Sequence, residues 1–133
     1  MHLRVAIEDG RPDIELSSAA ELDQALSDAD SRSRDLGLLN IIILKAPNDD
    51  WLSLVVGGDE TVLSFNYGHG EPPYFVSKGE AHRDEPVLTA FVGLAHHTEF
   101  SRRWVIPMSA ARSAALEFAT TGQRPSGIDW VEV

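Results

Sequence analysis

Residues 106–133 read IPMSAARSAALEFATTGQRPSGIDWVEV, and this stretch predicts a helix, a turn and a closing strand. Apolar residues recur in it at the spacing of one helical face, with offsets of 0, 3, 7, 10 and 11 from the first. These residues are Met108, Ala111, Ala115, Phe118 and Ala119. We therefore expect a helix over residues 107–121 that packs this face against a core.

Proline and glycine set the limits of this helix. Pro107 suits the first helical turn, where a missing N–H costs little. Gly122 can adopt the left-handed conformation that ends a helix, and Pro125 prevents the helix from resuming. After this turn, Ile128 and Trp130 indicate a short strand with the indole facing inward.

The rest of the chain predicts one more helix and several strands. Ser18-x-x-Glu21 matches a capping box, in which the hydroxyl and the carboxylate each satisfy a free backbone N–H. Apolar residues at helical spacing follow it, so residues 19–33 read as an amphipathic helix. Residues 96–103 are ambiguous. Strand patterns occupy residues 3–8, 38–44, 51–56, 61–67, 74–76 and 87–94.

The order of these elements predicts the fold class. It runs strand, helix, several strands, helix, strand, which is typical of α+β proteins. We expect a mainly antiparallel sheet with the helices at about 19–33 and 107–121 packed chiefly on one face. The isoleucine-rich run at 38–44 indicates a central strand covered on both faces. At 133 residues, the chain is expected to form one domain over 1–133.

Composition excludes several classes of protein. A net charge of −10, from 21 acids and 11 bases, argues against binding nucleic acid through its phosphates. The chain has no cysteine, which excludes disulfides and thiolate metal sites, and no apolar run of the ~20 residues needed to span a bilayer. We expect a cytoplasmic protein. Its acidity serves either solubility alone or a partner with a basic surface.

Candidate catalytic and metal sites are weak. His96 and His97 with Glu99 could suggest zinc, but adjacent strand residues point to opposite faces and no third ligand follows at a typical spacing. There is no cysteine nucleophile and no Gly-x-Ser-x-Gly elbow. We therefore predict no metal, no cofactor and no enzymatic activity. The three tryptophans are expected to be core or half-buried sheet residues, although one could be a binding anchor.

The C-terminal pattern resembles that of the Imm1 immunity proteins, which accompany bacterial polymorphic toxins, notably deaminase-fold toxins. The resemblance lies in the proline-initiated, alanine-rich helix, the Thr121-Gly-Gln-Arg-Pro125 turn and the Ile128-Asp-Trp130 ending. A weaker match covers the strand at 51–56, the Gly57-Gly58-Asp59 turn, the strand at 61–67, and then Tyr74 and Gly79. Residues that read as a structural signature are Trp51, Trp104, Pro107, Phe118, Gly122, Pro125 and Trp130.

This resemblance implies a protein that neutralises a cognate toxin by binding it, without a nucleic acid, membrane or cofactor partner. Our hypothesis is that an acidic face covers the basic active-site surface of a nucleic-acid-modifying toxin. The candidate toxin contacts lie in turns and loops: Asp49, Asp50, Asp59, Glu60, Tyr67, His69, Glu71, Tyr74, Asp84 and Glu85. A second possible surface is the acidic face of the first helix, with Asp23, Asp28 and Asp30.

Two other functions stay open at this point. The chain could be an acidic binding or regulatory module of another pathway, which the neighbouring genes would distinguish from an immunity protein. It could also be a small carboxylate-dependent hydrolase, which would need paired acids in a cleft. The identity of the toxin, the face that binds it, the choice between occlusion and allosteric inhibition, and the oligomeric state do not follow from the residues.

Overall fold

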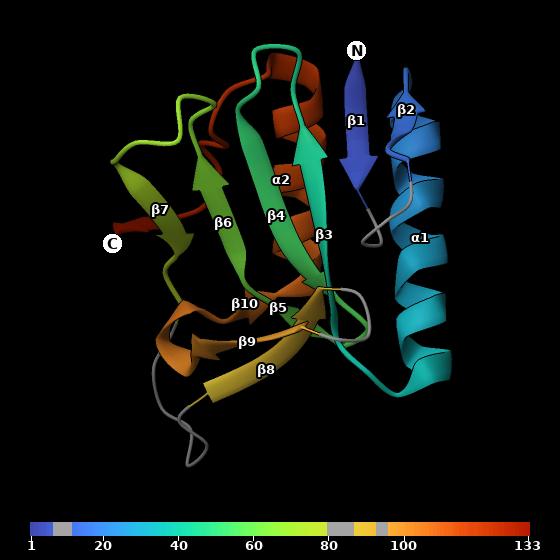
Figure 1. The fold of residues 1–133 in the computed structure, drawn as a ribbon, viewed down its shortest axis with the longest axis vertical. Helices are drawn as coiled ribbons and strands as arrows, with labels where there is room; N and C mark the ends of the chain where they lie inside the picture. The colour runs from blue at the N-terminus through green and yellow to red at the C-terminus, as the bar shows by residue number, and fades with distance from the viewer. Residues whose placement is uncertain (7–11, 80–86, 93–95) are drawn as a thin grey trace.

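The computed structural model describes residues 1–6, 12–79, 87–92 and 96–133, which form a sheet with helices on one face (Figure 1). The helices are α1 (Ala19–Leu36) and α2 (Met108–Thr121), and Arg102–Trp104 form a short 3-10 helix. The strands are β1 (Leu3–Ala6), β2 (Ile14–Leu16), β3 (Asn40–Lys45), β4 (Trp51–Val56), β5 (Glu60–Thr61), β6 (Leu63–Asn66), β7 (Tyr74–Ser77), β8 (Val87–Val92), β9 (His96–Ser101), β10 (Ile106–Pro107) and β11 (Trp130–Glu132). The predicted α+β class is confirmed.

The main sheet has the order β11-β7-β6-β4-β3-β1-β2, and every neighbouring pair in this order is antiparallel. β8 pairs with β9 and meets β3 in parallel at Asn40 and Phe91. β5 and β10 form a separate small ladder. Neither helix in the described part of the chain is long and apolar enough to cross a membrane.

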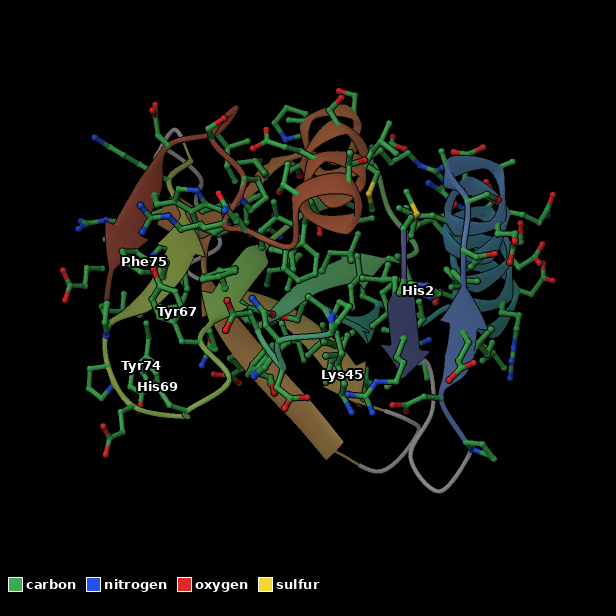
Figure 2. The ribbon with its side chains drawn as sticks, turned by 90° about the horizontal axis from the view of Figure 1, so that it is seen from above. His2, Lys45, Tyr67, His69, Tyr74 and Phe75 are labelled. Atoms are coloured by element: carbon green, nitrogen blue, oxygen red, sulfur yellow. The ribbon has the colours of Figure 1, made fainter. Side chains whose placement is uncertain are left out.

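The larger core lies between the sheet and the two helices, which Figure 2 shows on the same side of the sheet. Ala111, Ala115 and Phe118 of α2 are fully buried there, so the predicted apolar face of this helix is confirmed. Small alanine side chains let α2 approach the strands closely. The ring of Phe118 lies 6.1 Å from that of Phe65 on β6 and meets it edge to face.

A smaller core covers the opposite face of the sheet. It contains Ile41 and Val55 from β3 and β4, together with Leu88 of β8 and Phe100 of β9. The next residue along β3, Ile42, belongs to the helix-side core because successive strand residues point to opposite faces. The expectation that this isoleucine-rich strand is covered on both faces is therefore confirmed.

Both predicted helices form, with small differences at their ends. Ser18 caps α1 by accepting a hydrogen bond from the Glu21 N–H at 3.2 Å, but the Glu21 carboxylate accepts from the hydroxyls of Ser17 and Ser18 and not from a backbone N–H. α1 continues three residues beyond the predicted end, to Leu36, and Gly37 closes it at φ 69°. Pro107 lies one residue before α2, as its N-cap.

The end of α2 and the closing strand follow the prediction. Gly122 adopts the left-handed conformation, with φ 70°, and its N–H donates to the Phe118 carbonyl at 2.7 Å. Trp130 begins β11, packs against the main core, and donates its indole N–H to the Pro125 carbonyl at 2.8 Å. All three tryptophans, predicted as core or half-buried residues, are half-buried: Trp51, Trp104 and Trp130.

The predicted strand over 61–67 is interrupted, and a buried hydroxyl explains why. Thr61 Oγ1 accepts from the Val55 N–H at 2.8 Å and donates to the Val55 carbonyl at 2.7 Å, so its side chain takes the place of a backbone partner for β4. The backbone of β5 is then free to pair with β10. Ser77 acts similarly, because its hydroxyl accepts from the Leu63 N–H and donates to the Trp104 carbonyl.

Three strands were not predicted clearly. β2 has only three residues, which are too few to show a strand period, and β10 has only two, of which Pro107 was expected in the helix. The ambiguous segment 96–103 forms β9 followed by the 3-10 turn. After β7, an added Cβ at Gly79 would overlap the Val105 carbonyl, which explains why a glycine occurs at this crossing of two backbones.

We expect Phe118→Ala to lower the free energy of unfolding by about 3–5 kcal/mol, because this fully buried ring would leave a cavity under α2. The matched control is Leu116→Ala on the same helix, because Leu116 is 43 % exposed. We expect this variant to change the free energy of unfolding by no more than about 0.5 kcal/mol. Urea unfolding measures both. Equal losses in the two variants would contradict the assigned orientation of α2.

Candidate functional site

Six of the ten predicted contact residues gather at one end of the sheet. The turn between β3 and β4 (residues 46–50) and the loop between β6 and β7 (residues 67–73) lie at the upper end in Figure 1. We call these two segments, with the adjoining Tyr74, the loop end. The predicted residues in it are Asp49, Asp50, Tyr67, His69, Glu71 and Tyr74.

The two segments of the loop end contact each other directly. The Gly68 N–H donates to Asp50 Oδ1 at 2.8 Å. An added Cβ on Gly68 would stand 2.8 Å from the backbone carbonyl carbon of Asp49, so only glycine allows this approach. Asn48 joins the end of α2 to the same turn, because its side-chain amide reaches the Gly122 carbonyl at 3.4 Å.

The adjacent acids Asp49 and Asp50 have different surroundings. The Asp49 side chain is 73 % exposed and pairs with Arg4 at 3.2 Å, and its backbone has φ 69°, which aspartate tolerates better than most residues. The Asp50 carboxylate is half-buried and accepts hydrogen bonds from the Gly68 N–H and from the side-chain amide of Asn48. Asp49 is therefore available to a partner, whereas Asp50 holds the two loops together.

Aromatic side chains form the other part of the loop end (Figure 2). The ring of Tyr67 stacks on that of His69 with a centroid distance of 5.6 Å, and the Tyr74 hydroxyl donates to the Gly70 carbonyl at 2.8 Å. His69 Nδ1 accepts a hydrogen bond from the Glu71 N–H at 2.9 Å. The loop thus presents ordered rings beside the exposed Glu71 carboxylate.

Sequence reasoning missed two residues beside this loop. The guanidinium of Arg124 lies 4.0 Å from the ring centroid of Phe75, which is a cation–π contact on the surface next to Tyr67. Arg124 was read only as part of the turn after α2. The sequence does hold one indication of its role. The conformation of this turn requires its glycine and its proline but not an arginine, so the arginine can serve another purpose.

Asp59 and Glu60 lie at the other end of the sheet, Asp59 in the connection between β4 and β5 and Glu60 as the first residue of β5. The six residues of β4 separate them from the loop end by about 20 Å. Asp59 pairs with Arg34 at 3.3 Å, and Glu60 lies 3.7 Å from Arg102. The structure thus does not bring these two acids to the loop end. Asp84 and Glu85 lie outside the described residues.

The acidic face of α1 is smaller than predicted. Asp23 is exposed and pairs with Arg112 of α2 at 2.9 Å, and Asp28 is also exposed. The expectation for Asp30 is wrong, because its side chain is 22 % exposed and its carboxylate accepts from the Gly57 N–H at 2.8 Å. Asp30 also pairs with Arg34, and together with Asp59 it raises the pKa of that guanidinium.

The described residues contain no group of three histidine, aspartate or glutamate side chains placed to hold a metal ion. His96 and His97 are neighbours in β9, and their side chains are outside what the structure describes. The loop end itself offers exposed carboxylates and ring faces on a well-connected backbone, and the Arg124 guanidinium lies beside it. Such a set of groups is suited to recognising a protein surface.

We expect Asp50→Ala to lower the free energy of unfolding by about 1–3 kcal/mol, because the Gly68 N–H and the Asn48 amide lose their acceptor. Asp49→Asn is the control, since asparagine also tolerates the left-handed backbone, and should stay within about 0.5 kcal/mol. Thermal unfolding and amide hydrogen exchange at Gly68 measure the effect. If Asp49→Asn were the more damaging change, the assigned roles would be reversed.

A comparison with protein families identifies the family of this chain. The family model described as Immunity protein Imm1 matches residues 10–132, which is nearly the whole chain. A comparison with curated proteins found no match. The matched range includes both helices and the turn at 121–125 that carries the resemblance. Because this match covers nearly the whole chain, the chain belongs to the Imm1 family of immunity proteins.

Proposed function

We propose that this protein neutralises its cognate toxin by binding it with the loop end and covering the toxin's active site. The observation that carries the proposal is the position of Asp49 and Glu71, two exposed carboxylates on touching loops, beside the stacked rings of Tyr67 and His69. Acids at the rim and aromatic rings at the centre are a common composition for a specific protein interface.

Charge supports the choice of partner. A toxin that modifies nucleic acid needs a positive groove for phosphates, and carboxylates on a chain with net charge −10 can compete for that groove. We propose a deaminase-fold toxin as the partner, as the resemblance implies, and the cytoplasm of the producing cell as the place of action, because the nucleic acids at risk are there. A standard interface would bury roughly 800 Å² on each protein.

The ion pair between Arg4 and Asp49 is compatible with this role. Both side chains are substantially exposed, with 46 % and 73 % of their areas accessible. Exposed pairs contribute only about 0–1 kcal/mol, so a lysine or arginine of the toxin can replace Arg4 at little cost. The Arg124 guanidinium, held over Phe75, can in turn pair with an acid of the toxin.

Co-expression with the toxin domain encoded beside this gene tests the proposal. We expect a stable one-to-one complex on gel filtration, restored growth of the host, and loss of nucleic-acid binding by the toxin in the complex, since occlusion excludes the substrate. A complex that still binds its nucleic-acid substrate would contradict occlusion. No complex and no rescue would overturn the assignment of this toxin as the partner.

Neutralising the loop-end acids should slow association. We expect the double variant Asp49→Asn, Glu71→Gln to reduce the association rate constant roughly three- to tenfold at low salt, with the difference shrinking as salt screens the charges. The control is Asp35→Asn, Glu99→Gln, which removes two exposed charges far from the loop end. Stopped-flow or surface-plasmon kinetics measure both. Identical rates for the two variants would remove the loop end from the steering surface.

A further inference from the structure

A hollow of about 510 Å³ lies between β2 and α1, and none of its lining residues belongs to the loop end. Its apolar lining includes Ile14 of β2 with Ala25 and Ala29 of α1. Its charged lining residues are three acids, Glu15, Glu21 and Asp28, and one basic residue, Arg32. An apolar floor with three acids and one base around it is suited to a partner that is apolar and basic at once.

The register of β2 shows to which face of the sheet the partly exposed Ile14 points. Ile14 pairs with Val5 and Leu16 pairs with Leu3, so all four side chains point to the helix-covered face of the sheet. Val5, Leu3 and Leu16 are buried in the main core, but Ile14 keeps 46 % of its area exposed. The hollow therefore contains a large apolar side chain that the fold leaves only half covered.

The backbone of β2 adds a second kind of binding group. β2 is the last strand of the sheet order, and its only partner among the described strands is β1. Along such an edge, alternate residues direct their N–H and C=O groups away from the sheet, where an added strand can pair with them. When a peptide binds by β-strand addition, its backbone hydrogen bonds to such an edge provide affinity, and neighbouring side-chain pockets provide specificity.

We propose that β2 and the hollow beside α1 bind an extended apolar segment of the toxin that is flanked by lysine or arginine. This inference rests on the proposed function. In a strand added to β2, every second side chain would point toward Ile14, Ala25 and Ala29. The intervening side chains would point to the face on which Glu15 stands opposite Arg4, so that face requires no basic residue. Basic side chains that flank the apolar residues can reach Glu21 and Asp28 of the hollow.

The hollow is connected to the loop end. A neighbouring depression of about 200 Å³ shares Glu15 and Leu16 with it and is also lined by Arg4. Arg4 in turn pairs with Asp49 of the β3–β4 turn. One toxin can therefore cover the loop end with its folded body and place an adjoining extended segment along β2. The two contacts would act as parts of a single interface.

Two variants with the same charge change test the inference. Ile14→Arg places a cation in the hollow, whereas Leu116→Arg places one on a residue of α2 that is similarly exposed, at 43 %, and lines neither the hollow nor the loop end. With the toxin domain encoded beside this gene as the probe, we expect calorimetry to show an affinity loss of at least tenfold for Ile14→Arg. Leu116→Arg should stay within twofold, with unchanged melting curves for both.

Amide hydrogen exchange provides a measurement that needs no variant. Exchange at residues 14–16 should slow at least tenfold when the unmodified protein binds the toxin, because an added strand would protect outward N–H groups of β2. This protection decides the matter if Ile14→Arg disturbs folding. Equal affinities for the two variants with no protection at 14–16 would overturn the inference and leave the proposed function intact.

Two further outcomes would also overturn it. If the unmodified protein does not bind the toxin at all, both the proposed function and this inference fail for that pair. If the protein alone is a dimer in sedimentation equilibrium, and Ile14→Arg makes it a monomer, the occupant of the hollow is a second copy of this chain. A monomer that gains protection at β2 only with the toxin would support the proposal.

Discussion

The burial of one ring, Phe65 on β6, is the constraint on which much of the structure depends. Its centroid lies between 5.1 and 6.5 Å from the rings of Tyr67, Phe75, Phe118 and Trp130. These four residues come from the β6–β7 loop, β7, α2 and β11, so one fully buried side chain of β6 brings together the helix, the middle of the sheet and the closing strand. The same ring network reaches the surface, because Tyr67 also stacks on His69.

Local sequence patterns predicted the parts of this fold that depend on local interactions. The period of α2, its glycine end and the strands at β3 and β4 all follow from neighbouring residues. The break after Thr61 does not, because it depends on a hydroxyl that bonds a strand six residues earlier in the chain. β2 was missed for a related reason, since its three residues are defined by pairing with β1 and not by a period of their own.

The residue types of the candidate site could be predicted from the sequence. The sequence did not show which of these residues are exposed to a partner and which hold the loops together. Asp49 and Asp50 look alike in the sequence, and only the folded chain distinguishes them, since the partner of Asp50 is Gly68, eighteen residues away. Asp30 was assigned to an exposed face by helical position alone, yet it accepts a hydrogen bond from Gly57, which is distant in sequence. Arg124 depends likewise on Phe75, a contact that no spacing rule predicts.

The link from Asn48 to the Gly122 carbonyl has a consequence for the thermodynamics of recognition. It connects the β3–β4 turn to the end of a helix, and Asp50 connects the same turn to the β6–β7 loop. Binding segments that are already ordered avoid a conformational entropy cost of about 0.5–1.5 kcal/mol for each side chain that would otherwise be immobilised. Docking at a surface ordered in this way would resemble rigid-body association more than coupled folding.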